Sequence, residues 1–149
     1  MNNRERIALF AGTFDPYTKG HHAIVQRALQ LFDKVVVAVG RNMEKRSMLP
    51  PEQRLAQIEN IYANEPRVQA ALYDGLTVDY ARKVGATALL RGVRSVKDFE
   101  YERDLADINM RIDGMETIIL ISAPEYAVVS SSLVRELAAH GKDVSEFLP

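Results

Sequence analysis

Short apolar runs alternate with amphipathic segments along the whole chain. Five runs are continuous and rich in apolar residues, and they cover residues 7–11, 34–39, 68–73, 87–90 and 117–121. Runs of this kind are typical of strands buried on both faces of a parallel sheet. Between and after them, apolar residues recur at helical spacing, which predicts helices over residues 23–32, 50–62, 77–84, 96–112 and 130–141. We therefore expect one α/β domain over residues 1–149, with helices on both faces of the sheet.

The segments that contain candidate ligand-binding residues follow the first, second, fourth and fifth expected strands. In parallel sheets of this kind, ligands bind beyond the carboxyl ends of the strands, where the strand order reverses. We expect these segments to meet at one edge of the sheet and to form a single site.

The loop after the first strand combines a glycine, a hydroxyl and a histidine at the start of a helix. Gly12 allows the backbone to approach an anion closely. The free N–H groups and the dipole of a helix N-terminus attract negative charge, and Gly20 lets His21 lie at that helix start. These features predict a phosphate site, and the alternative is a plain strand-to-helix turn with a solvated His21.

Two arginines end the fourth expected strand. Arg91 and Arg94 offer planar donor groups that suit phosphate oxygens, with a glycine between them. Asp98 and Tyr101 lie on the next helix, where Asp98 has a second interpretation as the surface partner of Arg94 at a spacing of four residues.

A cluster of three serines, residues 130–132, begins the last helix. Capping explains one of them, because Ser132 followed by Arg135 and Glu136 is close to a capping box. The other two hydroxyls predict a second phosphate site at a helix N-terminus. Lys45, in the loop after the second strand, is a candidate cation for the phosphate that is transferred.

Bulk composition narrows the classes of function. A net charge of −1 argues against a general nucleic-acid binder, and the lack of cysteine excludes disulfides and thiolate metal sites. We find no apolar run long enough for a membrane span and no signal-peptide pattern at the N-terminus. We therefore expect a cytoplasmic protein that contacts neither nucleic acid nor membrane.

Two motifs carry a family resemblance. Residues 18–21, Thr-Lys-Gly-His, resemble the T/H-x-G-H signature of the nucleotidyltransferase superfamily. Residues 91–102, the serine cluster and the ending at residues 143–149 resemble bacterial phosphopantetheine adenylyltransferases over nearly the whole chain. Thr18 supports that family, because nicotinate-nucleotide adenylyltransferases and cytidylyltransferases usually carry histidine at this position.

The resemblance implies a dinucleotide-binding-like, Rossmann-type fold and a homohexamer. It implies an enzyme of coenzyme A biosynthesis that joins ATP and 4′-phosphopantetheine into dephospho-coenzyme A and pyrophosphate. The cofactor would be Mg²⁺, held mainly by ATP oxygens and water rather than by protein ligands.

The resemblance also assigns residues by position. His21 would stabilise the transition state, and Thr13 would hold the incoming phosphate near the α-phosphate of ATP. Lys45 and Arg91 would bind the phosphate of phosphopantetheine, and Thr77 would line its pantetheine arm. The residues implied to surround ATP, besides Thr13 and His21, are Phe14, Gly92, Val93, Arg94, Glu102, Tyr126, Ala127, Val128, Val129, Ser130, Ser131 and Ser132.

One assignment is less secure than the others, and two other functional hypotheses remain. Thr77 is polar where the family often has an apolar residue, so its contact is the least secure of these assignments. A second hypothesis is a nucleotidyltransferase that acts on nicotinate mononucleotide or a polyol phosphate, against which Thr18 and the motif at residues 91–102 count. A third is a catalytically silent nucleotide-binding module, against which the intact His21, Lys45 and arginines count.

Overall fold

The computed structural model describes residues 4–41 and 47–149. The strands are β1 (Ile7–Gly12), β2 (Lys34–Gly40), β3 (Val68–Tyr73), β4 (Ala88–Val93) and β5 (Glu116–Ile121). The helices are α1 (Lys19–Ala28), α2 (Pro51–Ile61), α3 (Thr77–Lys83), α4 (Val96–Asp113) and α5 (Ser131–Ala139). Two short 3-10 turns, η1 (Pro124–Tyr126) and η2 (Ser145–Phe147), complete these elements.

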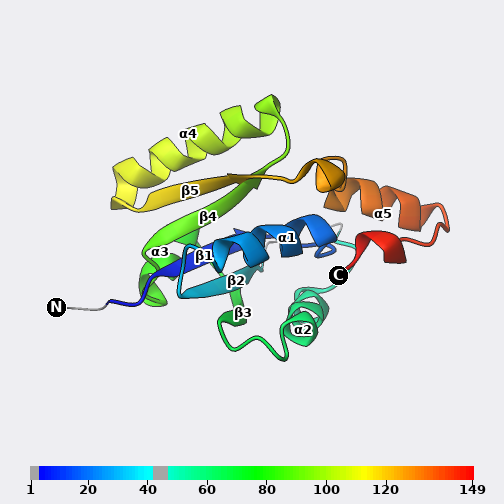
Figure 1. Ribbon diagram of the computed structural model, residues 1–149, viewed down its shortest axis with the longest axis horizontal. Coiled ribbons are helices and arrows are strands. Elements are labelled where there is room, and N and C mark those ends of the chain that lie inside the picture. The colour runs from blue at the N-terminus through cyan, green and yellow to red at the C-terminus, as the bar shows by residue number, and fades with distance from the viewer. Residues whose placement is uncertain (1–3, 42–46) are drawn as a thin grey trace.

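The strands form a single parallel sheet in the order β3-β2-β1-β4-β5. The chain runs outward from β1 to β3, returns to the middle and then runs outward in the other direction, so the order reverses between β1 and β4. The helix α5 lies past the ends of the strands, after the η1 turn (Figure 1). The predicted α/β class and the parallel sheet are confirmed.

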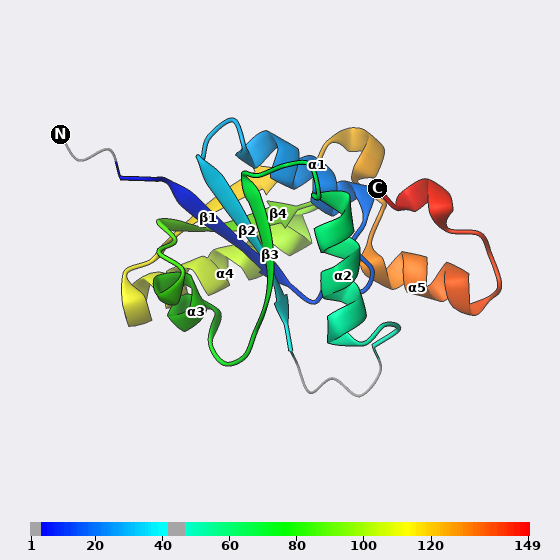
Figure 2. The same ribbon diagram turned by 90° about the horizontal axis from the view of Figure 1, so that it is seen from below.

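The two faces of the sheet carry separate apolar cores. On one face, α1 and α2 pack on alternate residues of the central strands, such as Phe10, Val37 and Leu90. On the other, α3 packs on the intervening residues, such as Leu9 and Leu89, and α4 lies over β4 and β5 (Figure 2). Side chains alternate between the faces of a strand, which explains why continuous apolar runs are needed here.

Two boundaries differ from the sequence-based expectation in ways that matter for the site. The helix α1 begins at Lys19 instead of residue 23, because Thr18 caps it, and His21 therefore lies inside its first turn. The strand β4 continues to Val93, so Arg91 and Gly92 belong to the strand and pair with β5. Both residues are thereby held by the sheet ladder rather than by a loop.

Candidate active site

A cavity of about 310 Å³ opens at the carboxyl ends of β1 and β4, where the strand order reverses. We call it the strand-end cavity. Its walls come from the β1–α1 loop, the end of β4, the η1 turn and the N-terminus of α5. This is the edge at which the sequence-predicted segments were expected to meet.

His21 is held by a capping box at the start of α1. The Thr18 backbone N–H donates to Nδ1 of His21 at 3.0 Å, and the Thr18 hydroxyl accepts from the His21 backbone N–H at 3.4 Å. Histidine here takes the place that glutamate or glutamine usually has in this motif. Since Nδ1 accepts a hydrogen bond, the proton of the neutral ring lies on Nε2.

The electrostatic surroundings keep this ring neutral. Burial, and then the positive charges of Arg94 and Arg91, lower the pKa of His21 to about 4. At neutral pH the side chain is therefore a neutral hydrogen-bond donor through Nε2. Such a donor stabilises negative charge on a neighbouring oxygen without a charge of its own.

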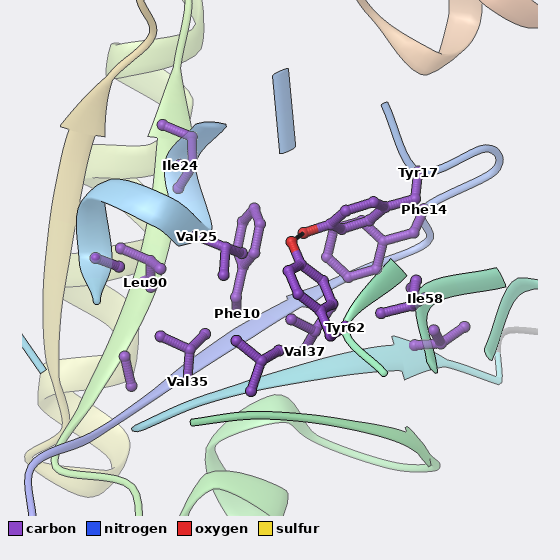
Figure 3. Close-up of a cluster of buried hydrophobic side chains, with 14 residues drawn as sticks. Phe10, Phe14, Tyr17, Ile24, Val25, Val35, Val37, Ile58, Tyr62 and Leu90 are labelled. Atoms are coloured by element: carbon purple, nitrogen blue, oxygen red, sulfur yellow. Dashed lines mark hydrogen bonds between the residues drawn. The ribbon is translucent and has the colours of Figure 1, made fainter. Parts of the chain in front are cut away.

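Aromatic rings pack around His21 and fix its plane. Phe14 meets the His21 ring edge-on at a centroid distance of 5.0 Å, and the Tyr17 ring lies 5.2 Å from it at an angle of 30°. Phe14 has a φ of 52°, in the left-handed region, and its ring is buried in the core beside Tyr17 (Figure 3). A Cβ at Gly12 would lie 3.1 Å from this ring. The small size of Gly12 thus makes room for Phe14. Gly12 also lines the strand-end cavity, and its expected close approach to an anion stays a prediction.

Arg91 is anchored on both sides. Its Nε and Nη2 donate to the two carboxylate oxygens of Glu102 at 2.6 and 2.7 Å, and Nη1 donates to the Ala11 carbonyl at 2.7 Å. Burial opposes the charge of Arg91, but hydrogen bonds and charge from Glu102 outweigh it and raise its pKa. Glu102 is 6% exposed and bound to Arg91, and it lines a different cavity.

The surface pair of Arg94 and Asp98 is confirmed, and the phosphate role of Arg94 stays a prediction. Arg94 lines the strand-end cavity, and its Nε also lies 3.4 Å from an Asp98 carboxylate oxygen, as expected for the surface pair. Gly92 lines the same cavity, and a Cβ there would lie 3.1 Å from Cγ1 of Ile24. A larger residue at position 92 would therefore displace the wall formed by α1.

The three serines of α5 have three different partners. Ser130, rather than the expected Ser132, is the N-cap, because its hydroxyl accepts from the Leu133 backbone N–H at 3.1 Å. The Ser131 hydroxyl donates to the Pro16 carbonyl at 2.7 Å, and the Ser132 hydroxyl accepts from Arg135 at 3.2 Å. All three serines line the strand-end cavity. The expectation that capping explains only one of them is confirmed.

A second cavity, of about 300 Å³, lies on the other face of the sheet, between β1, β4 and β5 and the helices α3 and α4. We call it the α4 cavity. Apolar side chains make up most of its wall, among them Leu9, Leu76, Leu89, Leu105, Ile108 and Ile112. Ala11 and Arg91 line both cavities, so the two are neighbours at the end of β4. Thr77 lies in this second wall, and its hydroxyl is 2.9 Å from that of Tyr73.

Comparison with known proteins shows to which family this chain belongs. The cytidylyltransferase-like family matches residues 9–137. The phosphopantetheine adenylyltransferase of Porphyromonas gingivalis is 51% identical over 146 residues, which cover 98% of this chain and 95% of that protein. The chain belongs to the phosphopantetheine adenylyltransferase family. The Bacteroides fragilis member is 49% identical over 144 residues, covering 97% of this chain and 96% of that protein.

Solved structures agree on the fold. A bifunctional NMN adenylyltransferase/ADP ribose pyrophosphatase from Francisella tularensis aligns with a TM-score of 0.72 and 18% identity. The alignment covers 97% of this chain and 45% of that longer one. At this level of identity the likeness supports the nucleotidyltransferase fold alone.

The structure brings most of the expected residues of this adenylyltransferase family to one place. Those in the wall of the strand-end cavity are Thr13, Phe14, His21, Arg91, Gly92, Arg94, Tyr126, Val129, Ser130, Ser131 and Ser132. Thr77 and Glu102 line the α4 cavity, Val93 is buried in the sheet, and Val128 is 74% exposed. Ala127 follows η1 and lies outside both walls. Lys45 lies outside the described residues.

Three residues of the site were not selected from the sequence as ligands or anchors. Arg135 lines the strand-end cavity and donates to the Asp15 carbonyl at 2.7 Å. Both Asp15 carboxylate oxygens accept backbone N–H groups, from Met48 and Leu49 at 2.6 and 2.9 Å. Arg54 is 2% exposed and donates to the Thr13 carbonyl. The spacing of Arg135 one turn after the serine cluster is the one sequence signal that could have identified any of them.

Among residues 4–41 and 47–149, no group of three His, Cys, Asp or Glu side chains is placed to hold a metal ion. The same residues include no helix that is long and apolar enough to cross a membrane.

Proposed function

We propose that the chain transfers the adenylyl group of ATP to 4′-phosphopantetheine, which gives dephospho-coenzyme A and pyrophosphate. This is the penultimate step of coenzyme A biosynthesis, and we place it in the cytoplasm. The observation that carries the proposal is the pair of cavities that meet at Ala11 and Arg91. Two helix N-termini and a neutral histidine in the strand-end cavity suit ATP, and the apolar wall of the α4 cavity suits a pantetheine arm.

The residues fit the needs of this reaction. An oxygen of the acceptor phosphate attacks the α-phosphorus of ATP, the bond to the bridging oxygen breaks, and pyrophosphate leaves. The attacking phosphate is already ionised at neutral pH, so no general base is needed. Positioning and charge stabilisation remain, and Nε2–H of His21 and the N-terminus of α5 provide donors for the α-phosphate and the leaving group.

Arg91 is the candidate for the acceptor phosphate at the junction. Of its five N–H groups, three are used by Glu102 and Ala11, which leaves two for a ligand. The Glu102 carboxylate holds the guanidinium plane, so the remaining donors have a fixed direction. The second cation proposed for this phosphate, Lys45, lies outside the described residues.

We propose that Mg²⁺ arrives with the nucleotide. The described residues include no cluster of acidic or imidazole ligands, and the Asp15 carboxylate is already occupied by two backbone N–H groups. The residues in hand therefore do not form a magnesium site of their own. Phosphate oxygens and water would supply the ligands of the ion.

We also propose a homohexamer. The edge strand β5 and the helix α4 expose large apolar side chains, including Val96, Tyr101, Ile112 and Ile121 with exposures of 75%, 63%, 58% and 71%. Apolar surface of this kind supports association between subunits. Light scattering should give a mass of about six times the 16.7 kDa of the chain.

The decisive experiment is a coupled assay of pyrophosphate release from ATP. We expect release that depends on added 4′-phosphopantetheine and negligible release with nicotinate mononucleotide or glycerol 3-phosphate. Both of these acceptors carry a phosphate for Arg91 but lack the pantetheine arm, and each methylene group missing from an apolar cavity lowers kcat/KM by about 10–200-fold. Comparable kcat/KM for nicotinate mononucleotide would overturn the substrate assignment, and no turnover with any acceptor would favour the silent nucleotide-binding module.

A further inference from the structure

A hydrogen-bonded chain of three aromatic side chains lies behind the His21 ring, and the proposed reaction does not use it. Tyr17 belongs to the β1–α1 loop, Tyr62 ends α2, and His22 follows His21 in α1. The hydroxyl oxygens of Tyr17 and Tyr62 are 2.6 Å apart, and Figure 3 shows the two hydroxyl groups pointing toward each other. The Tyr62 hydroxyl also lies 2.9 Å from Nδ1 of His22. We call these residues the tyrosine brace.

Both ends of the tyrosine brace are connected to His21, the candidate catalytic histidine. Tyr17 is fully buried, and its ring packs on His21 at a centroid distance of 5.2 Å. At the other end, His22 is bonded through the backbone to His21. The orientation of His21 is therefore tied to the end of α2 from two sides, once through the Tyr17 ring and once through the first turn of α1.

Only one arrangement of protons gives both tyrosine hydroxyl groups of the brace an acceptor. The Tyr17 hydroxyl has Tyr62 as its one hydrogen-bond partner among the described residues. If Tyr62 donated to Tyr17, the buried Tyr17 proton would have no acceptor, which is unfavourable in a protein interior. Tyr17 therefore donates to Tyr62, and Tyr62 donates to Nδ1 of His22.

The pKa shifts show that the three groups of the brace are uncharged. Burial raises the pKa of both Tyr17 and Tyr62 and lowers that of His22, so all three groups are neutral at physiological pH. The proton of the His22 ring then lies on Nε2, as it does in His21. The brace is thus a fixed, uncharged support that has a single hydrogen-bonding direction.

We infer that Tyr62, acting through Tyr17, is a positioning residue that holds the His21 ring in its productive orientation. The inference rests on the proposed function only in that His21 serves the adenylyl transfer. Neither tyrosine lines the strand-end cavity, so their effect passes through His21. A small displacement of an oriented donor is sufficient to slow a reaction that depends on positioning.

Kinetics of Tyr62→Phe, Tyr17→Phe and the double variant test the inference. Each single variant should lower kcat by about tenfold, the effect of one lost hydrogen bond, while KM for both substrates stays unchanged. The double variant should be no slower than Tyr62→Phe, because Tyr62→Phe already removes the hydrogen bond that Tyr17→Phe removes. Tyr80→Phe is the matched control, because Tyr80 stacks on Tyr73 on the opposite face of the sheet. An unchanged kcat in both single variants, or losses that multiply in the double variant, would overturn the inference.

A second measurement does not depend on turnover. The chain has three histidines, so nitrogen-15 spectra of the imidazole rings can be assigned with few variants. The wild type should show His21 and His22 with the proton on Nε2. In Tyr62→Phe, His22 should sample both tautomers and the His21 ring signals should shift or broaden. If the His21 signals match those of Tyr80→Phe, the brace is rejected whether or not the protein is an adenylyltransferase.

Discussion

The strand-end cavity and the α4 cavity share Ala11 and Arg91, yet the chain builds them in opposite ways. Backbone groups hold the first: the Thr18 N–H fixes His21, and Ser131 and Arg135 donate to carbonyls of the β1–α1 loop. The second is a gap between the sheet and two helices, and its shape depends on side-chain volume.

This difference separates the two kinds of substrate interaction. A cavity held by hydrogen bonds keeps donors in fixed positions, which favours the charge that develops during transfer. A cavity lined by apolar side chains selects by fit and binds ground state and transition state alike. Loss of a hydrogen-bond donor in the strand-end cavity should therefore lower kcat, whereas a change in the volume of either cavity should raise KM for the substrate that it binds.

The strongest test of the comparison is His21→Ala. The variant should fold normally and lose about 10²–10³-fold in kcat, the usual effect of removing one transition-state donor. His140→Ala is the matched control, because His140 is exposed at the end of α5. A kcat within about threefold of the wild type would reject the role given to His21.

The junction of the two cavities gives the next largest effect. In Arg91→Met, the buried Glu102 carboxylate loses its partner, which should lower the free energy of unfolding by about 3 kcal/mol. This is the lower end of the range for buried pairs, because the Arg91 side chain keeps an exposure of 33%. Chemical denaturation of Arg91→Met and of the wild type measures the loss.

A double variant separates the structural role of Arg91 from its proposed role in binding. Arg91→Met with Glu102→Leu replaces the buried pair by apolar groups and should recover most of the lost stability. Activity with 4′-phosphopantetheine should stay low, because the phosphate donor is absent. Recovery of both stability and activity would show that Arg91 only balances Glu102.

The sequence predicted the sheet and the site edge for a clear physical reason. Buried parallel strands need continuous apolar runs, and helix starts need capping residues such as Thr18 and Ser130, so both leave local patterns. His21, Arg91 and the serine cluster could be selected because each of these residue types suits phosphate at the end of a strand or the start of a helix.

What the sequence could not predict depends on contacts between distant segments. The Arg91–Glu102 pair, the Arg135 contact with Asp15 and the tyrosine brace join residues 11, 120 and 45 positions apart. Arg54, buried in α2, contacts Thr13 across 41 positions. No local spacing rule reports such pairs, because each partner alone is consistent with an ordinary surface residue.

The pH dependence of stability gives a smaller effect that belongs to the strand-end cavity alone. The pKa of His21 is lowered to about 4 in the folded protein, whereas imidazole in an unfolded chain titrates near 6.5. Between these values the unfolded state binds more protons, so stability falls as the pH falls. From pH 7 to pH 5 this should remove about 2 kcal/mol of stability.

The matched variant for this measurement is His21→Gln, which lacks the titrating group. Its unfolding free energy should depend less on pH over the same interval by about 2 kcal/mol, measured by urea denaturation at both pH values. All other groups, His22 included, titrate in both proteins and cancel in the difference. Equal pH dependence in the two proteins would mean that the folded-state pKa of His21 is not lowered.

The smallest expected effect sharpens the comparison most directly, because it changes one cavity at a time. Ala106→Leu adds three carbon atoms to the wall of the α4 cavity, and Gly92→Ala places a Cβ 3.1 Å from Ile24 in the strand-end cavity. Overpacking of this size should weaken binding by about tenfold. Ala106→Leu should raise KM for 4′-phosphopantetheine and leave that for ATP unchanged, and Gly92→Ala should do the reverse. Steady-state kinetics with each substrate varied in turn measures both constants. If either variant raises the two KM values equally, the two cavities do not bind separate substrates, and the assignment of one substrate to each cavity is wrong.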